Sequence, residues 1–369
     1  MFVVEGKTKL IVPASFLKKA HFYNPEMELA RDLTVLLLLC IGSDNWVVLD
    51  ALTGIGARGV RIAKETDIKE VWLNDYSKDA LRYAKRNVEI NRVKTRTKIF
   101  GRDANVLMFS YPNSFDYIDI DPFGSPTYYL NSAAKAMKKV GVIGVTATDT
   151  GNLAGTFPLT CFRKYGVKSF KTEFMHELGV RILIASVALT FARWDYSFQL
   201  LLSYWYKHYY RVWGIARKGK RNANKMVKEN IGYLSYCQKC LWRSVGKKPI
   251  CSCKNCGSEI IIVPNVWIGK IEDVAIIEKC EKKLRESDWL RKRDELKKLL
   301  GFLKNEDTQV FFYDLHELAG KWKVKVPKKS VVCEKLKEMG YFCYATHFSP
   351  VGIKTNASLQ EIRKIFSIV

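Results

Sequence analysis

The segment VVLDALTGIGARG, residues 47–59, constrains the fold more than any other part of the chain, because an apolar run passes directly into a glycine-rich turn. The apolar run predicts a buried strand, and Gly54, Gly56 and Gly59 follow it with the spacing G-x-G-x-x-G. Glycine lets a backbone turn tightly and approach a ligand, and the start of the following helix offers free amide groups. We therefore predict a nucleotide-binding turn; a glycine-rich turn without a ligand is the alternative.

Short apolar runs alternate with amphipathic stretches from Trp46 to about Tyr206, which is the pattern of a parallel sheet covered by helices on both faces. We expect strands at 47–51, 71–73, 117–120, 142–147 and 198–204, and a helix at 79–90. After Trp213 the composition changes, because RKGKRNANK supplies five basic residues in nine positions. We expect this stretch to be either a solvated linker or an RNA-facing arm. The sequence thus predicts an α/β, Rossmann-like domain over residues 1–215 and a smaller α+β C-terminal domain over residues 216–369.

Acidic residues follow the predicted strands at the places where such folds bind nucleotides. Asp50 ends the first strand, and Asp75 ends the second, about twenty residues beyond the first glycine, where a carboxylate holds a ribose diol. Both residues are predicted to bind cofactor, although this pattern alone suits a nicotinamide dinucleotide as well as S-adenosylmethionine. Asp103 and Ala104 follow a third strand-like segment, and we expect them to bind an adenine edge; Asp103 as a helix cap is the alternative.

The loop DPFGSP directly follows the fourth strand, FDYIDI, where an open α/β sheet presents its ligand crevice. An exocyclic amine on a base is a poor nucleophile, because its lone pair is delocalised into the ring, so hydrogen-bond acceptors must orient it. We predict that the Asp121 carboxylate and the Pro122 carbonyl accept its two N–H bonds, while Phe123 stacks on the base. This loop favours methyl transfer from S-adenosylmethionine; a plain chain reversal at Pro122 and Gly124 is the alternative.

The segment HFYNP, residues 21–25, precedes an amphipathic helix and is predicted to form a lid over the pocket. Phe22, Tyr23 and Asn24 are its candidate substrate-binding residues. Arg31, on the following helix, and Arg58, in the glycine-rich segment, are expected to reach the carboxylate of methionine through bidentate contacts. Ordinary surface arginines are the alternative for both.

Four of the ten cysteines form two C-x-x-C pairs separated by twelve residues, which is a strong zinc signature: Cys237, Cys240, Cys253 and Cys256. Four thiolates fill a tetrahedral site and leave no position for substrate, so we predict a structural zinc ion rather than a redox dithiol. Cys251 is an alternative to Cys253. The remaining cysteines lie singly in apolar stretches and are expected to be small core or helix residues: Cys40, Cys161, Cys280, Cys333 and Cys343.

The charge balance indicates a polyanionic partner. Lys and Arg number 61 against 37 for Asp and Glu, so the formal net charge is +24, which favours nucleic acid over a membrane surface. The apolar run at 33–41 is too short to cross a bilayer and predicts a buried helix, and the N-terminus lacks the pattern of a signal peptide. We therefore expect a cytoplasmic protein without a membrane partner, and a monomer by default.

Taken together, FYNPEMELARDL, LDALTGIGARG, DPFGSP and the paired cysteines resemble the archaeal form of the tRNA (guanine-26-N2)-dimethyltransferase family over nearly the whole chain. The resemblance implies a class I methyltransferase domain, a family-specific C-terminal domain, and transfer of one or two methyl groups to N2 of a guanine in tRNA. It implies Asp121 as the catalytic acid and zinc at the four paired cysteines. It also implies these cofactor contacts: Arg31, Arg58, Asp75, Asp103 and Ala104.

Three other functions compete with this interpretation. A DNA or protein methyltransferase would use the same cofactor and a similar loop. A nicotinamide-dependent oxidoreductase would use the glycine spacing, although neither the charge nor the loop after the fourth strand favours it. A noncatalytic RNA-binding scaffold would retain the fold, although the intact Asp75 and Asp121 argue against it.

Overall fold

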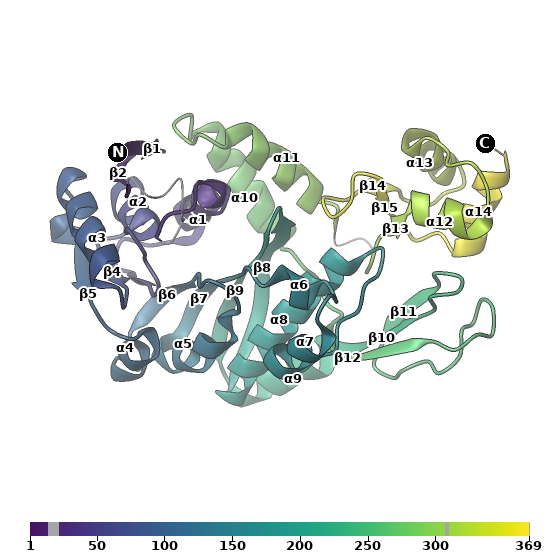
Figure 1. Ribbon diagram of the computed structural model, residues 1–369, viewed down its shortest axis with the longest axis horizontal. Helices are drawn as coiled ribbons and strands as arrows, with labels where there is room; N and C mark the ends of the chain where they lie inside the picture. Colours follow the sequence, from purple (N-terminus) through teal and green to yellow (C-terminus); the bar gives the residue numbers. More distant parts are fainter. Residues whose placement is uncertain (14–21, 307–309, 369) are drawn as a thin grey trace.

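The protein is described by a computed structural model that covers residues 1–13, 22–306 and 310–368. Its centre is a seven-stranded sheet with the order β5-β4-β3-β6-β7-β9-β8 (Figure 1). The strands are β3 (Val47–Asp50), β4 (Glu70–Asn74), β5 (Thr97–Phe100), β6 (Phe115–Ile120), β7 (Met137–Ala147), β8 (Tyr196–Tyr206) and β9 (Tyr209–Lys218). The chain runs outward from β3 to β5 and then returns to β6 beside β3, so the strand order reverses between β3 and β6. Open α/β sheets bind ligands at the carboxyl ends of the strands at such a reversal.

The last two strands correct the expectation of a wholly parallel sheet. Strands β3 to β7 are parallel to one another, whereas β9 is antiparallel to both β7 and β8. Lys207 and His208 alone connect β8 to β9, and a parallel connection needs a crossover of roughly a dozen residues or more. Strand β9 pairs with β7 as far as Arg217 opposite Val140, so the predicted boundary at residue 215 falls within this strand.

Helices cover both faces of the sheet, as the sequence predicts. One face carries α1 (Glu28–Ile41), α2 (Ala57–Glu65) and α3 (Lys78–Ile90), and the other carries α4 (Ala104–Ser110), α5 (Leu130–Ala136) and α8 (Met175–Arg193). Neighbouring strand residues point to opposite faces: Val48 packs in the cluster with α1, and Leu49 packs in the cluster with α8. The predicted helices at 33–41 and 79–90 are confirmed as parts of α1 and α3.

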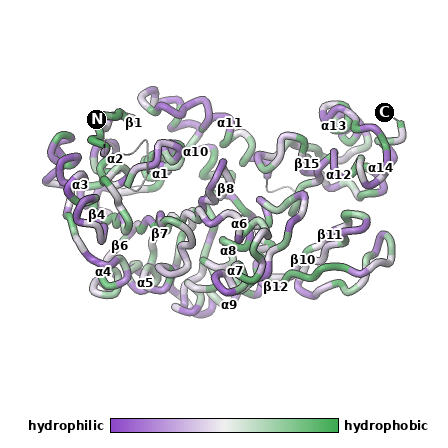
Figure 2. The backbone as a smooth tube through the Cα atoms, in the orientation of Figure 1, coloured by the Kyte–Doolittle hydropathy of each residue, from purple (hydrophilic) through white to green (hydrophobic). Residues whose placement is uncertain are grey.

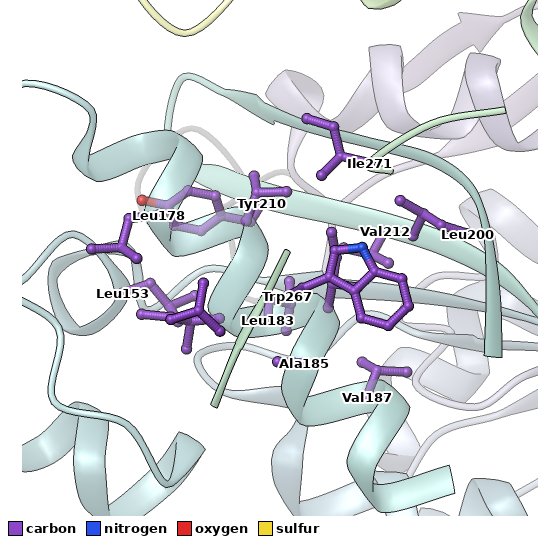
Figure 3. Close-up of a cluster of buried hydrophobic side chains, with 14 of the residues drawn as sticks. Leu153, Leu178, Leu183, Ala185, Val187, Leu200, Tyr210, Val212, Trp267 and Ile271 are labelled. Atoms are coloured by element: carbon purple, nitrogen blue, oxygen red, sulfur yellow. The ribbon is translucent and has the colours of Figure 1, made fainter. Parts of the chain in front are cut away.

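Helix α8 is the one described helix that is long and apolar enough to cross a membrane by length and composition. Within the protein, 72% of its most apolar window is buried. Figure 3 shows why: Leu183 and Val187 lie on α8 close to Val212 of the sheet and to Trp267. The apolar character of α8 therefore follows from its place between the sheet and the C-terminal region.

The C-terminal region consists of two small antiparallel sheets and five helices after α9. The first sheet has the order β11-β10-β12 and the second β13-β15-β14. The strands are β10 (Ile231–Tyr236), β11 (Arg243–Gly246), β12 (Ile261–Trp267), β13 (Tyr313–Asp314), β14 (Tyr344–Ala345) and β15 (Gly352–Lys354). The helices are α9 (Lys220–Asn230), α10 (Val274–Arg285), α11 (Arg293–Leu303), α12 (Leu315–Trp322), α13 (Lys329–Glu338) and α14 (Leu359–Ile368). Helices α10 and α11 pack against α1, so this region folds back over the first domain (Figure 1).

The remaining elements lie at the N-terminus, before β5 and around the carboxyl edge of the sheet. They are the hairpin β1 (Phe2–Glu5) and β2 (Thr8–Ile11), the short helices η2 (Pro25–Met27), η3 (Lys94–Arg96) and η4 (Pro126–Tyr129), and α6 (Thr150–Leu153) and α7 (Pro158–Tyr165). Figure 2 shows hydrophobic segments in the central strands and hydrophilic segments on outer helices such as α3 and α11. The polar outer helices and the apolar inner strands match the patterns from which both were predicted.

One cysteine expectation is wrong. Cys333 and Cys343 form a disulfide with Cα atoms 5.1 Å apart, whereas we expected unpaired core or helix residues. Their spacing forms no motif, so only the turn after α13, which brings β14 back toward that helix, reveals the pair. Cys40, Cys161 and Cys280 lie in α1, α7 and α10 as small helix residues, and the last two are buried.

Candidate active site and metal centre

The glycine-rich turn has the predicted form, and each of its glycines is needed for a different structural reason. Gly54 has φ +55° and Gly56 has φ +84°, a left-handed region that favours glycine. A Cβ at Gly54 would lie 2.6 Å from the carbonyl oxygen of Phe22, so this position accommodates the backbone of the predicted lid. A Cβ at Gly59 would lie 2.2 Å from Leu73, because α2 packs closely on β4. The turn therefore joins the lid, the first strand and α2.

The two acidic residues at the ends of β3 and β4 differ in burial and in hydrogen-bond partners. Asp75 accepts hydrogen bonds from the amides of Gly54 at 2.8 Å and Ser77 at 2.8 Å; burial raises its pKa, and these amides oppose the rise. Asp50 accepts from the Thr53 hydroxyl at 2.6 Å and the Gly59 amide at 2.9 Å. Burial, and after it the Asp119 carboxylate, raises the pKa of Asp50 to about 7. Asp75 is thus oriented at the rim, and Asp50 lies beneath the turn.

A cavity of about 560 Å³ opens at the carboxyl ends of β3, β4 and β6. Eleven of the predicted site residues line it: Phe22, Tyr23, Asn24, Arg31, Asp50, Gly54, Arg58, Asp75, Asp121, Pro122 and Phe123. The catalytic loop lies at one side of this cavity, where Phe123 is 78% exposed and its ring is therefore free to meet a ligand. The structure brings the predicted cofactor residues and the predicted catalytic loop into one space.

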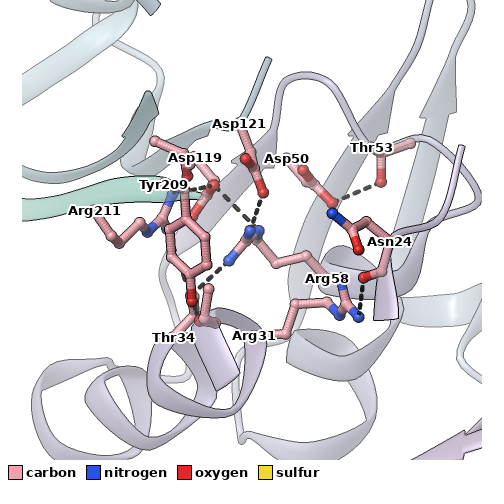
Figure 4. A network of polar contacts seen from close by, with 12 residues as sticks. Asn24, Arg31, Thr34, Asp50, Thr53, Arg58, Asp119, Asp121, Tyr209 and Arg211 are labelled. Carbon is pink, nitrogen blue, oxygen red and sulfur yellow. Dashed lines mark hydrogen bonds and ion pairs between the residues drawn. The ribbon is translucent and has the colours of Figure 1, made fainter. Parts of the chain in front are cut away.

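Neither arginine is the surface residue that the alternative interpretation required. Arg58 donates to the Thr34 hydroxyl at 2.7 Å, lies 3.2 Å from the Asp119 carboxylate and bonds to Asp121 Oδ2 (Figure 4). Arg58 is 4% exposed, so its charge is largely removed from water and is balanced by these two acids. Among the described residues, none donates a hydrogen bond to the second oxygen of Asp121, which lines the cavity.

Arg31 is also buried and has a different set of partners. Its Nε donates to Glu5 at 2.7 Å, and its Nη2 donates to the carbonyl oxygen of Asn24 at 3.0 Å. Burial would raise the pKa of Glu5, but the charges of Arg31 and Arg61 outweigh it and lower the value to about 2. Arg31 thereby ties the N-terminal hairpin to the lid segment while it lines the cavity.

Phe22, Tyr23 and Asn24 of the lid all line the cavity, and Tyr23 also holds the segment in place. The Tyr23 hydroxyl donates to Glu5 at 2.7 Å, and the residue is 4% exposed. Asn24 accepts from the Glu26 amide at 2.9 Å and begins η2, while Phe22 is half-buried beside the glycine turn. His21, also part of the predicted lid, lies outside the described residues.

Three predicted cofactor residues do not line the cavity: Gly56, Asp103 and Ala104. Asp103 is exposed and caps α4 by accepting from the Val106 amide at 3.0 Å, which is the alternative role that the sequence left open. Ala104 is buried in the core beneath it. The charge of Asp103 nevertheless acts on Tyr129, which lines the cavity. Burial raises the pKa of Tyr129, and the charges of Asp103 and Asp75 raise this pKa further.

Sequence reasoning missed the residues that reach the cavity from the hairpin β8–β9. Lys207, His208 and Tyr209 line it, although they are more than eighty residues beyond the catalytic loop. Arg211, two residues further along β9, pairs with Asp119 at 3.1 Å from below. Nothing in the local sequence marks this turn, because its role depends on β9 pairing with β7.

The two C-x-x-C pairs meet at the end of the first small sheet. All four sulfur atoms of Cys237, Cys240, Cys253 and Cys256 lie within 4.8 Å of one another, with 3.6 Å between Cys237 and Cys256 and 3.5 Å between Cys240 and Cys253. Tetrahedral Zn²⁺ with Zn–S bonds near 2.3 Å places its sulfurs about 3.8 Å apart. The residues present therefore fit a zinc ion, and Cys251 is exposed and outside the group.

Each cysteine pair is held by the same backbone turn. The Leu241 amide donates to the carbonyl of Cys237 at 2.8 Å, and the Gly257 amide donates to that of Cys253 at 2.9 Å. Leu241 and Gly257 both have positive φ, at +62° and +70°. This repeated turn sets the two sulfurs of each pair on the same side of the site, as a tetrahedral ion requires.

Comparison with known proteins bears on the whole chain. A family model described as TRM, N2,N2-dimethylguanosine tRNA methyltransferase, matches residues 3–367. A protein of Methanobrevibacter smithii named tRNA (guanine(26)-N(2))-dimethyltransferase is 38% identical over 375 residues, covering 98% of this chain and 96% of that protein. A protein of the same name from Pyrococcus horikoshii is 36% identical, with 96% and 95% covered.

A solved structure of similar architecture exists as well. It is described as the complex structure of Trm1 from Pyrococcus horikoshii with S-adenosyl-L-methionine, and it superposes with a TM-score of 0.91 at 34% identity, covering 99% of both chains. The predicted fold class, a Rossmann-like methyltransferase domain with a smaller α+β C-terminal domain, is confirmed.

Proposed function

Because the chain belongs to the N2,N2-dimethylguanosine tRNA methyltransferase family, we propose that it transfers one or two methyl groups from S-adenosylmethionine to N2 of guanine 26 in tRNA. The observation that carries this proposal is that Asp75 and the loop of Asp121, Pro122 and Phe123 face one cavity at the reversal of strand order. A carboxylate that suits a ribose and a loop that suits a base amine thus share one space. This combination favours methyl transfer over hydride transfer.

The residues on the β3–β4 side fit the cofactor. S-adenosylmethionine, when bound, supplies an electrophilic methyl group. Asp75 is fixed by the amides of Gly54 and Ser77 and has acceptor capacity left for ribose hydroxyls. Tyr129 lines the cavity with Asp75, and burial and then the charges of Asp103 and Asp75 raise its pKa, so these side chains are the candidates for the adenosine end. Arg31 is the candidate for the methionine carboxylate.

On the opposite side, the catalytic loop orients the amine. Asp121 Oδ2 is held by Arg58, so the other oxygen and the Pro122 carbonyl accept the two N–H bonds of a guanine amine, and Phe123 stacks on the ring. Asp121 then accepts the proton that the amine loses. The Asp121 side chain is 19% exposed, which gives this proton a route to water. A monomethylated product retains one N–H for a second round.

Nucleoside analysis after incubation with unmodified tRNA transcripts and methyl-labelled S-adenosylmethionine tests the reaction. We expect N2,N2-dimethylguanosine from the wild type, none from a transcript in which guanine 26 is adenine, and a rate about 10²- to 10⁴-fold lower from Asp121→Ala. Asp116→Ala, on β6 but outside the cavity, is the matched control and should retain activity. Label in another nucleoside would overturn the substrate, and no label in any RNA would favour a noncatalytic scaffold.

The four-cysteine cluster is proposed to hold a structural zinc ion that orders the end of the first small sheet. Figure 1 places β10 and β11 at the opposite end of the molecule from β4 and β5, so this site acts on folding rather than on catalysis. We expect one zinc per chain by atomic absorption in the wild type and in Cys251→Ser, and metal loss in Cys240→Ser. Zinc loss in Cys251→Ser with retention in Cys253→Ser would contradict the ligand set.

A further inference from the structure

Large apolar side chains are exposed together around α7, which the reaction described above does not use. Phe157 is 57% exposed, Leu159 71% and Phe162 54%. Leu159 and Phe162 are three positions apart on the helix and therefore lie on the same side of it. Tyr128, at the end of the catalytic loop, is 62% exposed. These four residues form the α7 patch, and clusters of this kind mark interaction surfaces.

The charge around the α7 patch is predominantly positive. Residues 150–172 contain no Asp or Glu, and they contain Arg163, Lys164, Lys168 and Lys171. The Lys168 amine lies 5.9 Å from the centre of the Phe162 ring, and the Lys164 amine lies 6.0 Å from that of Tyr128. Cations and aromatic faces therefore alternate on one surface, which is the composition of sites that bind single-stranded nucleic acid.

The two acids that flank the segment do not reverse this charge. Glu173 follows it, but its side chain is 3% exposed and pairs with Arg243 at 2.6 Å. Asp149 precedes the segment, and its carboxylate accepts from Tyr165 at 2.6 Å and from Asn152 at 2.7 Å. It also pairs with Lys164 at 3.4 Å. Its side chain is 10% exposed, so it presents little negative charge to a ligand on the patch.

Hydrogen bonds join the catalytic loop to Thr148, at the start of the segment that leads into α6 and α7. The Gly124 amide donates to the Thr148 hydroxyl at 2.6 Å, and the Thr148 amide donates to the Gly124 carbonyl at 3.0 Å. Helix α6 follows directly, and α6 and α7 both pack on the buried helix α8 (Figure 1). The patch and the loop are thus held in a fixed relation by the same core, so a polymer whose base enters the cavity passes close to α7.

We propose that the α7 patch binds the tRNA strand that flanks the target guanine, with unpaired bases stacked on Phe157 and Phe162 and phosphates held by Arg163, Lys168 and Lys171. The proposal rests on tRNA being the substrate. A guanine that reacts in the cavity leaves its stack, and its neighbours then lose stacking partners. Exposed aromatic rings replace those partners, and each stacked base contributes about 1–3 kcal/mol, or about 5- to 150-fold in affinity. The surface therefore compensates for the distortion of the tRNA.

Binding of an unmodified tRNA transcript to the full-length protein, measured by filter retention without S-adenosylmethionine, tests the proposal. The double variant Phe157→Ala and Phe162→Ala should raise Kd about 10-fold or more, and Lys168→Gln with Lys171→Gln should also lower the salt dependence by about one unit per lost phosphate contact. Phe109→Ala on α4, where the ring is 49% exposed, is the matched control and should bind like the wild type. The affinity for S-adenosylmethionine should be unchanged in all variants.

The outcomes separate this surface from the reaction itself. Unchanged tRNA affinity in both patch variants would overturn the proposal. A change from dimer to monomer in the aromatic variant, with tRNA affinity unchanged, would assign the patch to a second copy of the chain and would also overturn it. Weakened tRNA binding in the variants, with no dimethylguanosine made by the wild type, would support the surface and reject the proposed reaction.

Discussion

Two networks of buried charges occupy different places in this protein, and their differences separate function from folding. The active-site network consists of Arg58, Asp119, Asp121 and Arg211, and the interface network consists of Glu177, Arg181, Glu306 and Lys354. Each combines carboxylates and cations away from water. The active-site network ends on Asp121, whose side chain is 19% exposed, whereas no side chain of the interface network is more than 1% exposed. Only the first network offers a charged atom to a ligand.

The interface network instead bonds to the backbone of the C-terminal region. Glu177 of α8 accepts from the amides of Phe311 at 2.9 Å and Phe312 at 3.1 Å. Arg181 donates to the carbonyls of Trp267 at 3.2 Å and Gly269 at 3.0 Å. These bonds specify how the C-terminal region docks on α8. A buried charge is thus informative about function only when one of its partners opens into a cavity.

Removal of Lys354 should produce the largest change in stability. Lys354→Met leaves the carboxylates of Glu177 and Glu306 buried with less compensation, and we expect the free energy of unfolding to fall by about 3–5 kcal/mol. Urea denaturation followed by circular dichroism measures this loss. At a temperature where the variant is folded, its affinity for S-adenosylmethionine should match that of the wild type.

A matched control is available on the same region. Lys335→Met removes an exposed amine that pairs with Glu338 on α13, and we expect a change below about 0.5 kcal/mol. Equal effects of Lys354→Met and Lys335→Met would show that burial does not distinguish the interface pairs. A selective loss of cofactor affinity in Lys354→Met would show that the two networks are coupled.

A change at Arg58 should affect the reaction more than cofactor binding. Arg58→Lys keeps a positive charge, but an ammonium cannot reach Thr34, Asp119 and Asp121 in the fixed geometry of a guanidinium. We expect kcat to fall about 10- to 100-fold while Kd for S-adenosylmethionine, measured by calorimetry, changes less than about threefold. A large rise in Kd with an unchanged kcat would instead identify Arg58 as the contact to methionine that the family resemblance implies.

The sequence predicted those parts of the site that depend on neighbouring residues. The glycine turn, Asp75 and the loop at Asp121 each follow a strand directly, so their place at the carboxyl edge follows from the parallel sheet alone. The grouping of the four paired cysteines was predictable for the same reason, because each pair forms one short turn. The role of Asp103 stayed open, since a carboxylate before a helix suits both a cap and a ligand.

Features that join distant segments were not predictable. Arg211 contacts Asp119 across the sheet because β9 lies beside β7, and Lys207 lines the cavity because a short hairpin turn carries it there. The partnership of Glu177 with Lys354 joins positions 177 residues apart. The strand order and the docking of the C-terminal region were needed to identify each partner.

The smallest expected effect concerns the protonation of Asp50, a buried acid next to Asp119 of the active-site network, and its sign is opposite to that of the interface acids Glu177 and Glu306. Burial raises the pKa of Glu177, but the charges of Lys354 and Arg181 outweigh it and lower the value. Burial likewise raises the pKa of Glu306, but His347 and Lys354 outweigh it. The contribution of these two acids to the stability of the protein is therefore lost as the pH falls. The pKa of Asp50 is raised to about 7, first by burial and then by Asp119. The folded protein therefore binds a proton that the unfolded chain releases near pH 4, and the contribution of Asp50 to stability falls as the pH rises from about 4 to 7.

Asp50→Asn removes this proton while it keeps an acceptor for the Thr53 hydroxyl and the Gly59 amide. Urea denaturation at several values between pH 5 and pH 8 should show the variant gaining stability relative to the wild type as the pH rises, by about 1–3 kcal/mol over the range. Parallel curves for the two proteins would show that Asp50 is ionised in the folded state at all these values. Diverging curves would show that Asp50, beside the active-site network, holds an exchangeable proton near neutral pH in the folded protein.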